Sequence, residues 1–122
     1  MEFIKISNTV MNKYAVIVAG GNGSRMNSNT PKQFMLLKGK PVLYYAINTF
    51  LQTYSDCKII LVLAEEHIGM GQEIIDAFFD YDRIQITVGG RTRFHSVQNG
   101  LAKIEENDCI IFVHDAVRPL LS

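Results

Sequence analysis

Short runs of apolar, mostly β-branched residues recur along the chain and constrain its fold more than any other feature. Four of these runs are strand-sized: 13–19, 58–63, 84–88 and 109–113. Segments with apolar residues at helical spacing lie between them: Pro41 to Leu51, Glu66 to Phe79 and Thr92 to Ile104. Strands that are apolar on both faces and alternate with helices predict an α/β fold with a mostly parallel sheet, covered by helices on both faces. In the last helix, Val97, Leu101 and Ile104 are expected to face the sheet.

The composition is that of a globular domain with no broad charge bias. The chain has 122 residues, of which 48% are hydrophobic and 20% charged, and its 12 basic residues balance 12 acidic ones. We therefore expect one nucleotide-binding part over residues 13–122, after an N-terminal extension over 1–12 in which Met11 is an alternative start. A net charge of zero argues against a nucleic-acid partner.

Other sequence features concern the location of the protein. No apolar run is long enough to cross a membrane, and the first ten residues, with Glu2 and Lys5, do not resemble a secretory signal. The protein is therefore expected in the cytoplasm, without a membrane partner. Cys57 and Cys109 border apolar runs and are predicted to be buried, reduced thiols.

Glycine, charged and hydroxyl residues gather directly after three of the four predicted strands. These segments are Gly20–Arg25, Gly89–Arg93 and His114–Asp115. The carboxyl ends of parallel strands share one edge of an open sheet, and ligands bind along that edge. The sequence thus predicts a single site built from three loops.

The first loop has the composition of a phosphate-binding turn. Gly20, Gly21 and Gly23 would let backbone N–H groups approach phosphate oxygens, and Arg25 could hold two of those oxygens. Lys32 follows in a Thr-Pro-Lys-Gln stretch and could reach the same anion. The alternative is a turn that simply ends the strand, with an arginine on the surface.

Two other types of phosphate loop are alternatives for the same segment. No Walker motif is present. A dinucleotide loop would need a third glycine where Met26 stands, although Glu65 or Glu66 could serve as its acidic companion. The dinucleotide interpretation is therefore the weaker alternative.

The two later loops add a helix start and a carboxylate. Gly90 could let the backbone contact a nucleobase, with Ser96 adding a hydroxyl; the alternative for Ser96 is a helix cap or a surface serine. Asp115 follows a buried strand, where a divalent metal bound to a triphosphate would compensate its charge. The alternative for Asp115 is a structural salt bridge to Arg118. His95 has no partner at metal-ligand spacing and is expected on the surface or in packing contacts.

Four segments together resemble the 2-C-methyl-D-erythritol 4-phosphate cytidylyltransferase family of the non-mevalonate isoprenoid pathway. The family's glycine loop, its P-K-Q element, its G-G-x-x-R-x-x-S-V segment and its H-D-A-x-R-P signature match residues 18–26, 31–33, 89–97 and 114–119. The resemblance extends from about Lys13 to the end of the chain and implies a Rossmann-like nucleotidyltransferase fold, apparently truncated.

The resemblance also implies a reaction and residue roles. CTP and a polyol phosphate would give a CDP-polyol and pyrophosphate, with Mg²⁺ as the metal and a homodimer as the full-length form. Arg25 and Lys32 would stabilise charge at the α-phosphate, Asp115 would lie by the ribose and the metal, and Arg93 would support the base-binding loop. The remaining CTP-binding positions would be Ala19, Gly20, Gly21, Gly23, Gly90 and Ser96.

The chain departs from the family pattern in three ways. Gly20 replaces a common alanine, and Arg91 stands where some members have an acid. Members of the family are also considerably longer, and the additional part carries a dimer-forming arm, polyol-phosphate contacts and a further catalytic lysine. A ribitol 5-phosphate cytidylyltransferase and a non-catalytic nucleotide-binding fragment therefore stay as alternatives.

Overall fold

A computed structural model describes residues 11–19 and 31–117. Its main strands are β1 (Asn12–Ala19), β4 (Cys57–Leu63), β5 (Ile84–Val88) and β6 (Cys109–Asp115). Its helices are α1 (Val42–Thr53), α2 (Ile68–Phe78) and α3 (Arg93–Leu101). The short elements are η1 (Lys32–Phe34), β2 (Leu36–Leu37), β3 (Lys40–Pro41), η2 (Glu65–His67) and η3 (Tyr81–Arg83). All four predicted strands and all three predicted helices are therefore present.

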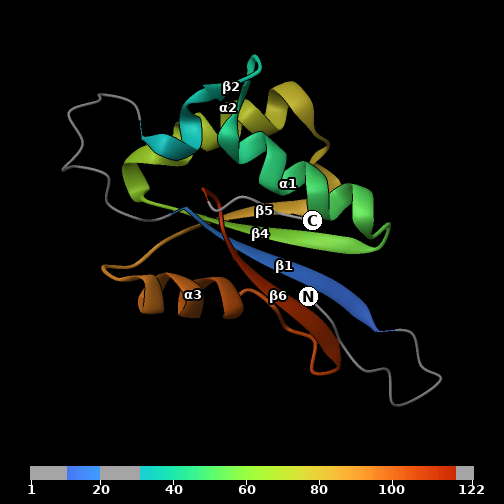
Figure 1. The fold of residues 1–122 in the computed structure, drawn as a ribbon. Helices are drawn as coiled ribbons and strands as arrows, with labels where there is room; N and C mark the ends of the chain where they lie inside the picture. Colours follow the sequence, from blue (N-terminus) through green and yellow to red (C-terminus); the bar gives the residue numbers. More distant parts are fainter. Residues whose placement is uncertain (1–10, 20–30, 118–122) are drawn as a thin grey trace.

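The four main strands form one parallel sheet in the order β5-β4-β1-β6. The central strands β1 and β4 are almost wholly buried, which explains why their sequences are apolar on both faces. Ile17 of β1 is in register with Leu61 of β4 on one side and His114 of β6 on the other. Because all four strands run the same way, their carboxyl ends lie along one edge of the sheet (Figure 1).

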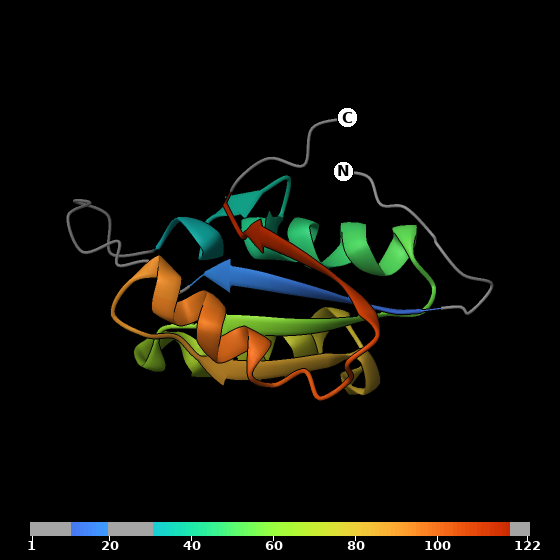
Figure 2. The ribbon, with the colours of Figure 1, turned by 90° about the horizontal axis from the view of Figure 1, so that it is seen from below.

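Helices cover both faces of the sheet, as predicted. Helices α1 and α2 lie on one face and α3 lies on the other, an arrangement that can be followed in Figures 1 and 2. The larger core cluster joins Ile17 and Leu61 to Leu43 and Ile47 of α1. Each such side chain contributes about 1.5–3 kcal/mol when it is fully buried.

Helix α3 packs closely against the other face of the sheet. That face is formed by the alternate strand residues Tyr14, Val16, Val18, Ile60 and Val62. Val97 and Ile104 pack against it as predicted, but Leu101 is 38% exposed and does not belong to the buried face. Gly100 takes its place: a Cβ at this position would lie 2.6 Å from Cγ1 of Val16. The absence of a side chain thus lets the helix approach the sheet.

A small antiparallel hairpin, β2–β3, precedes α1 and was not predicted from the sequence. Its two turn residues, Lys38 and Gly39, have φ angles of 54° and 84°, as in the two-residue turns that favour glycine. The hydroxyl of Tyr45 in α1 donates to the Leu37 carbonyl and ties the hairpin to the helix. Pro41 ends β3 and stands just before the first residue of α1, rather than within its first turn.

Among the described residues, no helix is both long enough and apolar enough to cross a membrane.

Candidate active site

The carboxyl edge of the sheet gathers those predicted site residues that the structure describes. Ala19 ends β1, Asp115 ends β6, and Gly90 lies between β5 and α3. Arg93 and Ser96 belong to α3, and Lys32 begins η1, directly beyond the segment that follows β1. The remaining predicted residues Gly20, Gly21, Gly23 and Arg25, together with Arg118, lie outside the described residues, and their roles stay predictions.

The side chain of Ser96 holds the connection between β5 and α3 through a hydrogen bond. Its Oγ accepts a hydrogen bond from the Gly90 N–H at 3.1 Å, and the residue is only 1% exposed. A Cβ on Gly89 would lie 2.7 Å from the same Oγ, so the backbone passes directly over this serine. Neither alternative for Ser96 is correct, because the residue is buried and the helix cap is Thr92, whose Oγ1 accepts from the His95 N–H at 3.1 Å.

Further contacts hold the same connection to its neighbours. The Gly89 N–H donates to the Leu63 carbonyl at 2.7 Å, which extends the β4–β5 pairing by one residue. The side-chain amide of Asn99, two turns into α3, donates to the Val88 carbonyl at 3.1 Å. Backbone, serine and asparagine hydrogen bonds thus hold the connection in place. Backbone groups that are held in this way can bind a ligand without first rearranging.

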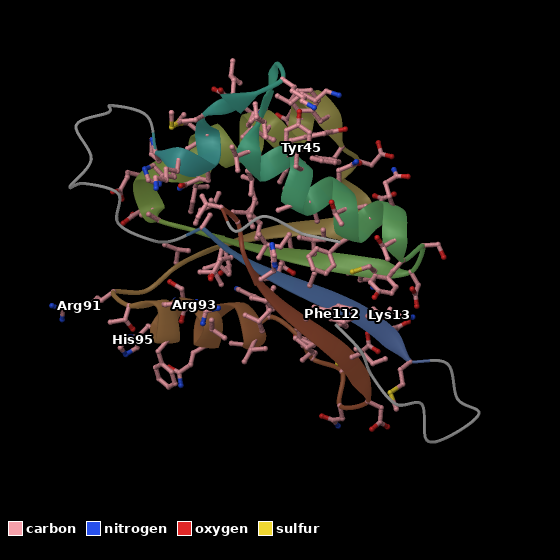
Figure 3. The ribbon with its side chains drawn as sticks, viewed as in Figure 1. Lys13, Tyr45, Arg91, Arg93, His95 and Phe112 are labelled. Carbon is pink, nitrogen blue, oxygen red and sulfur yellow. The ribbon has the colours of Figure 1, made fainter. Side chains whose placement is uncertain are left out.

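An ion pair joins the start of α3 to the end of β6. The Nε of Arg93 lies 2.9 Å from Oδ1 of Asp115, and the two side chains are 58% and 21% exposed. The sequence suggested Arg118 as the alternative partner of Asp115; within the described residues the ion-pair partner is Arg93. Arg91 and His95 lie by the first turn of α3, where Arg91 extends away from the sheet (Figure 3). His95 is exposed, as expected, and its ring packs edge-on against Phe94.

The described residues can be compared with what a metal ion at this edge would need. The described residues include no group of three His, Cys, Asp or Glu side chains that could hold a metal ion by themselves. The carboxylate of Asp115, at the end of β6, fits a magnesium ion that is held mainly by substrate phosphates and water. Glu65 and Glu66, the acids considered for a dinucleotide site, are exposed in η2.

The turn η1 brings Lys32 to the site and shows a residue that was not predicted. Lys32 is exposed, whereas Gln33 and Phe34 beside it are buried. The side-chain amide of Gln33 donates to the carbonyl of Ala19, the last residue of β1, at 3.2 Å. A glutamine between a lysine and an apolar residue gives little indication of this contact, because its partner lies 14 residues earlier in the chain.

Four groups with displaced pKa values lie at the opposite, amino end of the sheet. A hydrogen bond to Glu106, together with burial, raises the pKa of Tyr14 to about 12, and the same bond lowers the pKa of Glu106. Burial raises the pKa of the Cys57 thiol to about 11. Burial also raises the pKa of Cys109, although this residue is half-buried and not enclosed as predicted.

A parallel sheet with a rigid glycine connection, a lysine and an arginine–aspartate pair along its carboxyl edge has the architecture of a Rossmann-like nucleotidyltransferase. The family model of IspD, 2-C-methyl-D-erythritol 4-phosphate cytidylyltransferase, matches residues 13–122. The chain therefore belongs to this family, which also argues against the dinucleotide-binding alternative.

Individual relatives agree with this assignment. The chain is 48% identical over 110 residues to the 2-C-methyl-D-erythritol 4-phosphate cytidylyltransferase of Azobacteroides pseudotrichonymphae, covering 89% of the chain and 49% of the relative. It is 41% identical over 107 residues to the enzyme of that name from Clostridium botulinum, covering 88% and 47%. The chain thus spans about half the length of these curated relatives.

Solved structures share the fold. The 4-diphosphocytidyl-2C-methyl-D-erythritol synthase of Anaerococcus prevotii superposes with a TM-score of 0.74 at 25% identity, covering 92% of this chain and 46% of that structure. The bifunctional IspDF of Campylobacter jejuni gives 0.72 at 26% identity, with 91% and 27% covered. These structures support the fold assignment, and this chain covers less than half of each solved chain.

Proposed function

We propose that this chain forms the CTP-binding part of an enzyme that transfers CMP from CTP to 2-C-methyl-D-erythritol 4-phosphate and releases pyrophosphate. The observation that carries the proposal is the rigid Gly90–Ser96 connection beside the Arg93–Asp115 ion pair, in a chain of this family. The names of the curated relatives favour methylerythritol phosphate over ribitol 5-phosphate as the acceptor.

The proposed reaction needs cations more than a base. A phosphate oxygen of the acceptor attacks the α-phosphorus of CTP, a new P–O bond forms, and the bond to the β-phosphate bridging oxygen breaks as pyrophosphate leaves. The attacking phosphate oxygen of the acceptor is already ionised at neutral pH, so no side chain has to remove a proton from it. Arg25 and Lys32 would stabilise the charge that develops at the α-phosphate, and the protein would otherwise act by positioning.

The nucleoside would lie against the backbone of the sheet edge. Ser96 is 1% exposed and holds the Gly90 amide, so a base would contact mainly the backbone around Gly90. Ala19 and the glycines at 20, 21 and 23 would complete this surface. Fixed amide and carbonyl groups can distinguish cytosine from other bases by their hydrogen-bonding pattern, because an unmatched buried polar group is costly.

Magnesium would assist at the triphosphate. Asp115 would hold the ion, which neutralises phosphate charge when it is bound. Arg93 would keep the Asp115 carboxylate oriented through their 2.9 Å contact. The magnesium ion, the homodimer of the full-length form and the cytoplasmic location stay predictions, supported by the family resemblance.

Turnover is best tested with this chain continued by the C-terminal half of the Azobacteroides relative, here termed the joined protein. Pyrophosphate release is measured with CTP, Mg²⁺ and either methylerythritol phosphate or ribitol 5-phosphate. We expect release with methylerythritol phosphate, and Lys32→Ala should reduce kcat far more than CTP affinity. Release only with ribitol 5-phosphate, or equal losses of kcat and affinity, would contradict the proposed acceptor or the role of Lys32.

A further inference from the structure

The turn η1 carries one side chain outward and two inward. Lys32 is exposed, while Gln33 and Phe34 are each only 6% exposed. A buried amide is costly unless its polar atoms find partners, so an apolar side chain would be the simpler choice for filling this position. The use of glutamine therefore calls for an explanation in terms of its partner.

That partner is the carbonyl at the end of β1. The Nε2 of Gln33 lies 3.2 Å from the carbonyl oxygen of Ala19, and both residues are buried. The preceding carbonyl, that of Val18, accepts from the Ala116 N–H, whereas the register with β6 ends at the Val18–Asp115 pair. Ala19 is also in register with Leu63, the last residue of β4, and Gln33 thus supplies a side-chain donor to the last carbonyl of β1.

The rest of η1 is anchored independently of this bond. The ring of Phe34 belongs to the main core and packs edge-on against His67, with 5.4 Å between the ring centroids. The Phe34 N–H donates to the Pro31 carbonyl at 3.0 Å, and the Met35 carbonyl accepts from the Val42 N–H at 2.9 Å. These contacts hold η1 on α1 and η2, and the Gln33 amide adds the one side-chain hydrogen bond from η1 to β1 among the described residues.

From this geometry we infer that Gln33 is a positioning residue for cytidylyl transfer, which sets Lys32 at the end of β1. The inference rests on the proposed function, because it acts through the lysine that would stabilise the α-phosphate. The two residues are adjacent in a single turn, so a displacement of the Gln33 amide from Ala19 moves the Lys32 backbone with it. A shift of about 1 Å at a reacting group can reduce turnover on the order of a hundredfold.

Three substitutions separate the amide contact from simple packing. Gln33→Met retains the length of the side chain but removes the donor. Gln33→Glu places a carboxylate opposite the Ala19 carbonyl, and this variant donates again only when it is protonated. Gln52→Met repeats the first change on the exposed face of α1, far from the carboxyl edge, and serves as the matched control.

A double-substitution cycle with Lys32→Ala in the joined protein tests the inference. We expect Gln33→Met to lower kcat about tenfold with little change in KM for CTP, and Gln52→Met to leave both constants unchanged. In the Lys32→Ala background, Gln33→Met should lower kcat by less than about twofold, because the group it positions is absent. The inference would be overturned if Gln33→Met lowered kcat by the same factor with and without Lys32→Ala, or if Gln33→Met left kcat unchanged.

The Gln33→Glu variant covers the case in which Gln33→Met does not fold. Its kcat relative to the unsubstituted protein should rise as pH falls, because a protonated carboxyl can donate to the Ala19 carbonyl. A flat ratio across pH would overturn the positioning role. If the unsubstituted joined protein itself shows no CTP-dependent turnover, the proposed function fails, and this inference fails with it.

Discussion

Gly100 offers the most quantitative test of how α3 is seated on the sheet. In Gly100→Ala the new Cβ would lie 2.6 Å from Val16 Cγ1 and 3.0 Å from Val62 Cγ2. Both valines are fully buried and β-branched, so neither can rotate away easily. Such overpacking costs about 1–3 kcal/mol, and the better helix propensity of alanine returns about 0.5–1 kcal/mol. We therefore expect the free energy of unfolding to fall by about 1–2 kcal/mol.

The assay is equilibrium unfolding of the chain in urea at 25 °C. A loss of this size lowers the midpoint by about 0.5–1 M for a domain with a typical urea dependence. Gly69→Ala is the matched control, because Gly69 is exposed in α2 and a Cβ there meets nothing within 4 Å. The control should be neutral or slightly stabilising. If Gly100→Ala is as stable as Gly69→Ala, the close seating of α3 is incorrect.

Three further predictions follow from individual contacts. Ser96→Ala should lower the free energy of unfolding by about 1–3 kcal/mol in urea titrations, because a backbone N–H loses its buried acceptor; an unchanged midpoint would contradict that role. Because the pKa of Tyr14 is raised to about 12, its hydrogen bond to Glu106 stabilises the fold below pH 10, and this contribution is lost between pH 10 and about 12. The difference in unfolding free energy between the unsubstituted chain and Tyr14→Phe should therefore narrow over that range, and a constant difference would count against the contact. In the folded chain a thiol reagent should modify half-buried Cys109 before buried Cys57, so Cys109→Ser should remove the faster phase of labelling.

The sequence sufficed to predict the order of the main elements and the sheet edge along which the described candidate residues lie. The runs that form β1 and β4 are apolar on both faces because both strands are central, and this pattern is visible without coordinates. Parallel strands bring their carboxyl ends together, so residues as distant as Gly90 and Asp115 could be assigned to one edge.

Pairings across the fold were not predictable in the same way. Among the described residues Asp115 pairs with Arg93, which lies 22 residues away in the chain and meets it only once β6 and α3 are in place. Leu101 fits the helical pattern, yet the close contact at Gly100 directs the packing toward Val97 and Ile104. Local periodicity carries no information about such approach distances.

Hydrogen bonds from side chains to the backbone could not be predicted from the sequence either. The hydroxyl of Ser96 and the amide of Gln33 act on carbonyl or N–H groups of other elements, and their residue types alone are equally typical of caps and surfaces. The hairpin β2–β3 was missed because each strand has only two residues, too few to show any alternation.

The most direct test of the central claim is a thermal-shift panel on this chain with Mg²⁺ and CTP, UTP, ATP, GTP or NAD. A ligand at about a hundred times its Kd adds roughly 2.7 kcal/mol of stability, or about 10 °C for a domain of this size. We predict a shift of this kind that is selective for CTP. An equal shift with ATP or GTP, or a shift with NAD alone, would contradict the assignment of this edge as a cytidine nucleotide site.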